Sequence, residues 1–421
     1  MRRWRSGGRG LLLGGVLTTF AMLLYHMMSV PLLEVYHPRM LVLASCDRDP
    51  ILTKGKTIST KGAPRQVSGC SPKMNVMFMK THKTASSTIL NILFRFGEKH
   101  GLRFAFPNSR NDFVYPEMFN RLQVKGYQPG MCFNMVCNHM RFNESEVVSV
   151  LPPDATFITI LRDPADVFES AFHYFNSLVP LTWVIPAKEK LAEFLKDPWR
   201  YYSPNGYNSF YLKNLLLFDL GYDNNLEPDD PRVEQAIQAV DKRFQLVMVA
   251  EYFDESLILL KDTLCWELED LLFLRLNMRR DSSISKMTEH QRMQARDWNA
   301  ADWRLYRYFN ATFWAKVEVY GRERMAREVA ELRRRNAEMA TTCVEGGRAV
   351  EADSIRDATL QPWQPLGDRS IMGYNLRKDI DDVRHAECRR MLTPELQYMY
   401  ELGVNLWAKL FWRQMLGVIN L

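Results

Sequence analysis

The sequence predicts an α/β fold in which a parallel sheet is flanked by helices. Three short apolar runs, at 76–79, 157–161 and 246–250, are each followed by a segment with helical periodicity. Apolar runs of this length are typical of strands buried on both faces of a parallel sheet, and their alternation with helices indicates βα units. With 421 residues, of which 47% are hydrophobic, the chain can bury a large core.

The amino terminus predicts a membrane anchor. Residues 1–10 carry four arginines and no acid, and residues 11–33 contain no Asp, Glu, Lys or Arg. About 20 apolar residues span a bilayer, so we expect a transmembrane signal anchor at 11–33 and a cytosolic tail at 1–10. A cleaved signal peptide is the competing interpretation, but no clear small-residue cleavage site follows the apolar run.

The rest of the chain divides into a stem and one folded domain. Residues 34–72 mix Lys, Ser, Thr, Gly and Pro without periodicity and are predicted to form a luminal stem. The luminal domain is expected at 73–421. Glycosylation sequons at Asn143 and Asn310 agree with a single-pass type II topology in the secretory pathway.

Cysteine and charge content exclude some classes of protein. The seven cysteines include no C-x-x-C pair, which argues against a structural zinc site. In an oxidising lumen we expect disulfides, with at least one cysteine left over and the connectivity open. The net charge of +6 is spread along the chain, so nucleic acid is not an expected partner, whereas an anionic small ligand is.

The segment "KTHKTASST", residues 80–88, lies between the first strand and a helix predicted to end at Gly97. Strand-to-helix turns bind phosphate through unpaired N–H groups and the helix dipole. Lys83 would add a cation, and hydroxyl donors would come from Thr84, Ser86, Ser87 and Thr88. A polar helix cap that binds nothing is the alternative. A nucleotide-triphosphate loop would need glycines before the lysine.

A second motif, "FITILRDPADVFESAFHYF", follows the strand at 157–161. Arg162 stands at the carboxyl end of that strand, where open α/β sheets place ligands, and its guanidinium can grip a phosphate with two hydrogen bonds. Ser170 falls on the following helix. The alternative is an Arg162–Asp163 ion pair that closes a turn.

Together with "AFPNSRNDF", "CNHMRF", "PLTW" and "QPWQPLG", these motifs resemble the galactose 3-O-sulfotransferase family from about residue 75 to the carboxyl terminus. The resemblance implies the P-loop-like sulfotransferase fold, a Golgi location, and 3'-phosphoadenosine 5'-phosphosulfate (PAPS) as sulfuryl donor with no required metal. It places the 5'-phosphosulfate on residues 83–88, Ala85 included, and the 3'-phosphate on Arg162 and Ser170.

The resemblance also implies the acceptor, which is the 3-hydroxyl of a terminal β-galactose. Glycolipids such as galactosylceramide and lactosylceramide are favoured over glycoprotein galactose on this likeness alone. The membrane is then an expected partner, and a homodimer is a further expectation.

The predicted catalytic residues are His139, Lys83 and His82. His139 follows a short apolar run and is the expected general base, since an unperturbed imidazole titrates near neutral pH. His82 adjoins Lys83 and could contact the leaving phosphate or steer the acceptor. Arg279 is assigned to a loop over the adenosine, with a solvated basic turn as the alternative. His173 is expected to be structural.

Two competing functions and two further segments complete the predictions. The "DID" triplet at 379–381 matches the D-x-D of metal-dependent Golgi glycosyltransferases, although three-residue motifs are common by chance. A non-catalytic glycan-binding protein is the other alternative. Trp363 is predicted either to stack on a sugar or to pack within a rigid loop. The carboxyl end from residue 402 is predicted to be either a core helix or a helix at the membrane interface.

Overall fold

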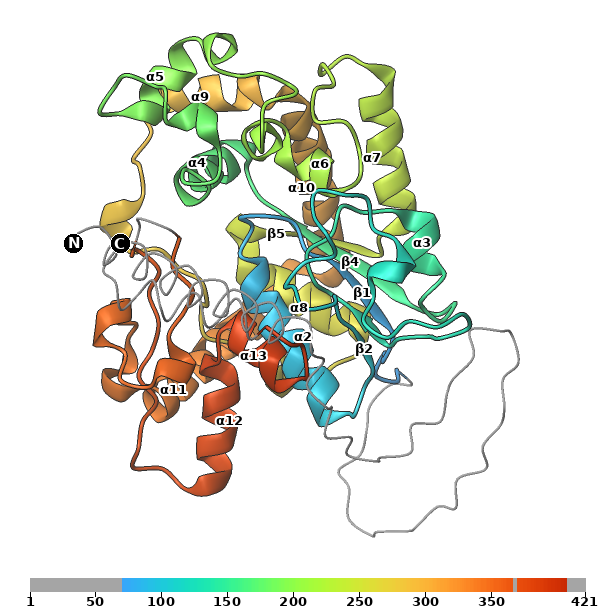
Figure 1. Cartoon of the computed structure of the whole chain (residues 1–421). Coiled ribbons are helices and arrows are strands. Elements are labelled where there is room, and N and C mark those ends of the chain that lie inside the picture. Colours follow the sequence, from blue (N-terminus) through green and yellow to red (C-terminus); the bar gives the residue numbers. More distant parts are fainter. Residues whose placement is uncertain (1–69, 366–368, 407–421) are drawn as a thin grey trace, which may run out of the picture. The chain divides into compact units, whose positions relative to one another are not determined.

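The computed structural model describes residues 70–365 and 369–406 (Figure 1). The predicted cytosolic tail, the anchor at 11–33 and most of the predicted stem lie outside these ranges, as does the carboxyl-terminal segment from residue 407. Within the described ranges, no helix is both long and apolar enough to cross a membrane.

Five parallel strands form one sheet in the order β2-β3-β1-β4-β5. The strands are β1 (Val76–Met79), β2 (Phe104–Ala105), β3 (Met135–Val136), β4 (Thr156–Leu161) and β5 (Leu246–Val249). Every residue of β1, β4 and β5 is buried, which explains why these segments are unbroken apolar runs. The predicted α/β class and its parallel sheet are confirmed.

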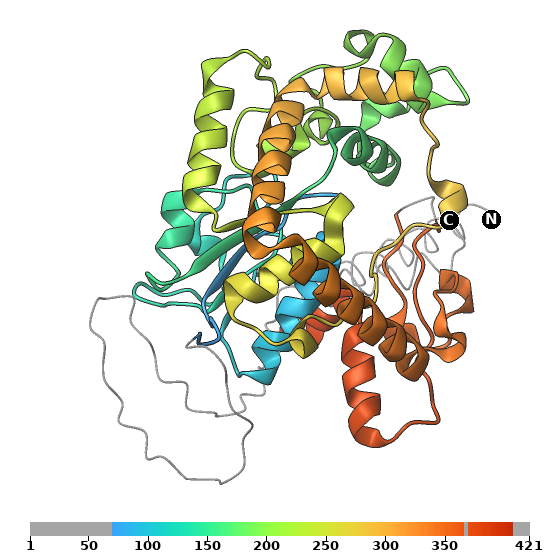
Figure 2. The same cartoon turned by 180° about the vertical axis from the view of Figure 1, so that it is seen from behind.

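Helices lie on both faces of this sheet, with α2 and α8 on one side and α4, α6 and α7 on the other (Figures 1 and 2). The α-helices are α2 (Ser86–Lys99), α3 (Glu144–Val148), α4 (Pro164–Tyr174), α5 (Lys190–Lys196), α6 (Leu215–Asp219), α7 (Pro231–Arg243), α8 (Phe253–Leu264), α9 (Glu289–Trp298), α10 (Ala300–Tyr320), α11 (Arg322–Cys343), α12 (Asp382–Leu392) and α13 (Glu395–Glu401).

The predicted end of α2 at Gly97 is wrong, because the helix continues to Lys99. Gly97 serves packing instead. A Cβ atom at this position would lie 2.2 Å from Cζ of Phe104, so only glycine lets the ring of the neighbouring strand approach the helix.

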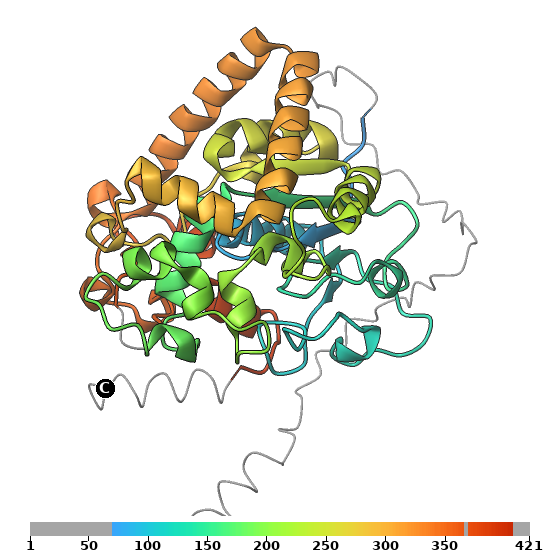
Figure 3. The same ribbon diagram turned by 90° about the horizontal axis from the view of Figure 1, so that it is seen from above.

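The long helices α10 and α11 meet at Gly321, whose φ of 97° favours glycine. Figure 3 shows the two helices diverging from this turn. The second of them, α11, packs against α8 and α12. This arrangement brings the carboxyl-terminal part of the domain back to the sheet.

Disulfides join distant parts of the domain, as the sequence predicted. Cys70 bonds to Cys265, Cys343 bonds to Cys388, and Cys132 is also disulfide-bonded. Cys137, next to β3, is a buried free thiol. The Cys343–Cys388 bond fastens α12 to the end of α11.

Replacing both Cys343 and Cys388 with Ser should lower the free energy of unfolding by about 2 to 4 kcal/mol. The disulfide spans a sequence separation of 45 residues, and opening it enlarges the unfolded ensemble. Thermal unfolding of the purified variant measures the loss, and Cys137→Ala, which removes the free thiol and keeps every disulfide, is the control. Equal melting temperatures for the wild type and the double variant would contradict this account.

Candidate active site

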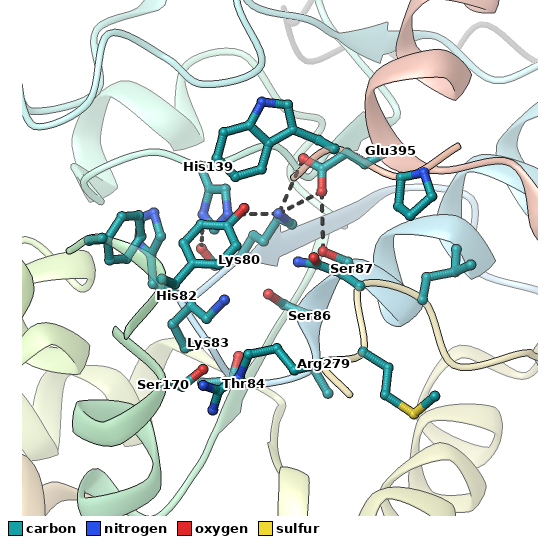
Figure 4. A pocket seen from close by; sticks show the side chains of 18 of the residues that line it. Lys80, His82, Lys83, Thr84, Ser86, Ser87, His139, Ser170, Arg279 and Glu395 are labelled. Carbon is teal, nitrogen blue, oxygen red and sulfur yellow. Dashed lines mark hydrogen bonds and ion pairs between the residues drawn. The ribbon is translucent and has the colours of Figure 1, made fainter. Parts of the chain in front are cut away.

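A cavity of about 1070 Å³ lies at the carboxyl ends of three neighbouring strands. Lys80 follows β1, His139 lies beyond β3, and Arg162 follows β4, and all three line the cavity. This is the edge at which parallel α/β sheets bind ligands, because strand ends and helix beginnings converge there. Figure 4 shows this cavity from close by.

The predicted strand-to-helix turn forms one wall of the cavity. Lys83 and Ala85 adopt left-handed backbone conformations, with φ of 61° and 63°, which turn the chain sharply into α2. Ala85 is the N-cap of α2, and it supplies no side-chain hydrogen bond to the helix end. The first residues of α2 therefore present an uncapped, electropositive helix terminus to the cavity.

The hydroxyls of this turn are mostly engaged within the protein. Thr84 and Ser86 both donate to the carbonyl oxygen of Thr81, at 3.1 and 2.7 Å. Thr88 Oγ1 accepts from the backbone N–H of Leu276 at 3.2 Å. The sequence interpretation treated these side chains as free phosphate donors, whereas in the structure they brace the turn. Their role toward a ligand stays a prediction.

The two predicted phosphate motifs meet in the same cavity. Arg162 donates to the backbone oxygen of Lys83 at 3.1 Å, so the guanidinium directly supports the turn. Ser170 on α4 also lines the cavity. Arg279 arrives from the loop after α8 and pairs with Glu169, which precedes Ser170. Residues as far apart in the sequence as Lys83 and Arg279 thus surround one site.

The surroundings of Lys83 are strongly cationic. Its ammonium lies 3.4 Å from the ring centroid of Tyr174. Burial lowers the pKa of Lys83 well below its usual value, and the positive charges of Arg279, Arg162 and Lys80 lower the pKa further. An anion bound here would relieve that repulsion and favour the charged form of the lysine.

Lys80, which the sequence analysis did not single out, is 2% exposed and lies at the centre of a polar cluster. Its ammonium lies 2.7 Å from Nε2 of His139 and donates to the Glu395 carboxylate at 3.0 and 3.2 Å. Ser87 Oγ donates to the same carboxylate at 3.2 Å (Figure 4). Lys80 belongs to the predicted turn at 80–88, whereas no sequence pattern marked Glu395 on α13 as a site residue.

His82 is held by a buried carboxylate. Asp219, at the end of α6, is fully buried and lies 2.8 Å from His82 Nδ1. It also accepts from the His82 backbone N–H at 2.7 Å and from the Tyr115 hydroxyl at 2.7 Å. Because Asp219 can only accept when ionised, Nδ1 carries the proton, and Nε2 is left with the lone pair. The sequence analysis did not find Asp219 or Tyr115.

His139 stacks on His82 with ring centroids 3.9 Å apart and planes 7° from parallel. Its Nδ1 donates to the backbone oxygen of Lys80 at 3.0 Å, so its Nε2 accepts from the Lys80 ammonium. Burial lowers the pKa of His139 well below its usual value, with further lowering by His82 and Lys80. The His139 ring is therefore neutral, and its Nε2 lone pair already accepts a hydrogen bond from the Lys80 ammonium.

Other predicted residues lie in different surroundings. Trp363 lines the cavity, 5.4 Å from the Tyr174 ring, so its sugar-stacking role stays a prediction. His173 contacts Ser285 at 2.7 Å, in keeping with a structural role. In the "DID" triplet, Asp379 pairs with Arg377 at 2.7 Å and Asp381 caps α12. No residue of that triplet belongs to the cavity lining, so the glycosyltransferase interpretation has no support in the described part of the chain.

Comparison with known proteins agrees with the predicted family. The family model described as "Galactose-3-O-sulfotransferase" matches residues 2–406. The chain is 55% identical over 416 residues to the galactosylceramide sulfotransferase of Bos taurus, which covers 98% of this chain and 97% of the relative. It is 55% identical over 414 residues to the protein of the same name from Homo sapiens, covering 97% and 96%. It is 43% identical over 337 residues to galactose-3-O-sulfotransferase 2 of Sus scrofa, covering 79% and 84%. The chain therefore belongs to the galactose-3-O-sulfotransferase family.

Proposed function

We propose that this chain transfers the sulfuryl group of PAPS to the 3-hydroxyl of a terminal β-galactose, with galactosylceramide as its main acceptor. The observation that carries the proposal is the single cavity in which Lys83, Arg162 and Ser170 converge beside two histidines. The relatives that share 55% identity with the chain are named for galactosylceramide, which supports this acceptor over glycoprotein galactose.

The residues of the cavity fit an anionic donor. Around Lys83, the positive charges of Arg279, Arg162 and Lys80 face the single negative charge of Glu169, and the α2 terminus adds positive potential. PAPS would supply an activated sulfuryl group. Lys83 and the start of α2 would hold its 5'-phosphosulfate, and Arg162 with Ser170 would hold its 3'-phosphate, while Arg279 would approach the adenosine side. Lys83 would offset the negative charge that develops on the phosphate when the sulfuryl group leaves.

We assign the general base to His82 in preference to His139. Asp219 fixes the His82 ring and its tautomer, so Nε2 can take the proton from the galactose 3-hydroxyl. In His139, by contrast, the Nε2 lone pair accepts a hydrogen bond from Lys80 and is not free to take that proton. His139 then acts by stacking on His82 and keeping that ring in place.

We also propose that the protein is a type II membrane protein of the Golgi with its catalytic domain in the lumen. The disulfides support an oxidising compartment. Asn143 is partly exposed, which leaves its sequon open to glycosylation, whereas Asn310 lies within α10 and its side-chain oxygen is buried. A homodimer stays a prediction.

The function is tested by incubating the full-length protein with sulfur-labelled PAPS and a panel of galactosides. The expected result is label on the 3-position of galactosylceramide and lactosylceramide. Absence of transfer to every β-galactoside would overturn the proposal, and labelling of glycoprotein galactose alone would overturn the choice of acceptor.

Changing Lys83 to Ala should lower kcat/KM at least about 10- to 150-fold, the equivalent of one charge-assisted contact worth about 1.5 to 3 kcal/mol. The reason is the lost charge beside the donor phosphate. Steady-state sulfotransfer with a melting curve of the same preparation measures this. Wild-type turnover in a folded variant would remove Lys83 from the mechanism.

Changing His82 to Gln should lower kcat about 10²- to 10⁴-fold, the usual contribution of a general base. Affinity for 3'-phosphoadenosine 5'-phosphate should stay close to that of the wild type, because the base faces the acceptor. The matched variant His139→Gln should show a smaller loss of kcat, since the His139 ring is proposed only to position His82. A larger loss in His139→Gln would return the role of base to His139.

Changing Arg162 to Ala or Ser170 to Ala should instead weaken nucleotide binding, by about 10- to 150-fold for the arginine and less for the serine. These residues are assigned to the 3'-phosphate, so both variants should lose less affinity for adenosine 5'-phosphosulfate, which lacks that phosphate. A smaller loss is still expected for the arginine variant, because Arg162 also supports the Lys83 turn. Calorimetric titration compares the binding of 3'-phosphoadenosine 5'-phosphate with the binding of adenosine 5'-phosphosulfate. Equal weakening for both nucleotides would mean that the residues support the fold and make no 3'-phosphate contact.

A further inference from the structure

The mouth of the cavity carries an exposed apolar surface. Leu178, Trp183, Val184 and Tyr207 are 45, 58, 69 and 76% exposed, and we call these four residues the rim patch. Leu178 and Tyr207 also line the cavity. Trp183 and Val184 lie on the same loop as Leu178, between α4 and α5, and do not contribute to the cavity lining.

Hydrogen bonds hold the two loops of the rim patch in place. The Asn208 side chain donates to the backbone oxygen of Leu178 at 2.8 Å, which joins the Tyr207 loop to the Trp183 loop. The indole N–H of Trp183 donates to the backbone oxygen of Asn176 at 2.7 Å, and Thr182 Oγ1 donates to the same oxygen at 3.0 Å. The indole is therefore satisfied at its polar end and fixed with most of its ring in solvent.

We propose that the rim patch rests on the lipid bilayer that carries the acceptor, an inference that depends on the proposed function. A glycolipid must place its galactose at His82 while its ceramide stays in the membrane. The mouth through which the sugar enters must then face the bilayer. Trp and Tyr are the side chains that favour the membrane interface, and Leu178 and Val184 add apolar area.

Continuity with the cavity favours a bilayer over a protein on this surface. Leu178 and Tyr207 belong to the cavity lining and to the rim patch at once. A protein or a second copy seated on them would obstruct the entrance for the acceptor. A bilayer covers the same apolar area and delivers the acceptor through it.

The test compares two acceptors in one preparation of the full-length protein, reconstituted in vesicles that contain galactosylceramide. The double variant Trp183→Ser/Val184→Ser should lose about tenfold or more of its activity on galactosylceramide, because interfacial binding scales with buried apolar area. Its activity on a water-soluble β-galactoside and its melting temperature should match the wild type. The control Val319→Ser/Val383→Ser removes side chains that are 90 and 80% exposed elsewhere and should change neither activity.

A fluorophore on V184C gives a second readout, with a fluorophore on V319C as the control. Nitroxide-labelled lipid should quench the label at 184 and leave the label at 319 bright. An unchanged ratio of the two activities, a parallel loss of both, or an unquenched label at 184 would overturn the proposal. Loss of a dimer in the double variant would assign the surface to a second copy instead. If the wild type sulfates neither acceptor, the proposed function fails, whereas quenching still reports on membrane contact.

Discussion

The buried ammonium of Lys80 is the constraint on which the rest of the site depends. A buried cation is stable only with partners, and Lys80 finds them in the Glu395 carboxylate and in Nε2 of His139. Glu395 in turn accepts from Ser87, at the start of α2. One ion pair therefore ties the end of β1 and the loop after β3 to α13, which is the last helix of the described chain. The carboxyl-terminal region becomes a wall of the cavity for this reason.

Other contacts fix α13 and α12 against α2. The Asn91 side chain donates to the backbone oxygens of Arg390 and Thr393 at 3.0 and 3.3 Å. The Tyr398 hydroxyl donates to Glu98 at 2.8 Å. The Cys343–Cys388 disulfide closes the loop that leads to this region. Since the start of α2 forms the turn that is proposed to bind the donor, residues about 300 positions later in the chain help to set where that turn lies.

Local patterns predicted the sheet and the strand-to-helix turn that lines the cavity, because buried strands and such turns have short-range signatures in the sequence. Ser170 was assigned from the family resemblance, and Arg162 was found from its place at the end of a strand. Asp219 and Glu395 were not, since each is a single carboxylate whose partner lies 137 or 315 residues away. Composition also misled in one detail. Gly97 was taken as a helix stop, although α2 runs on to Lys99 and the glycine makes room for Phe104.

The same positive charges that suit the donor also govern the stacked histidines. Burial and the nearby His82 and Lys80 keep the pKa of His139 low, so the ring is neutral before any ligand arrives. An anionic donor would offset the charges of Lys80, Lys83 and Arg162 and make it easier for an imidazole in this cavity to hold a proton. Donor binding would in this way favour proton acceptance within the cavity through electrostatics alone.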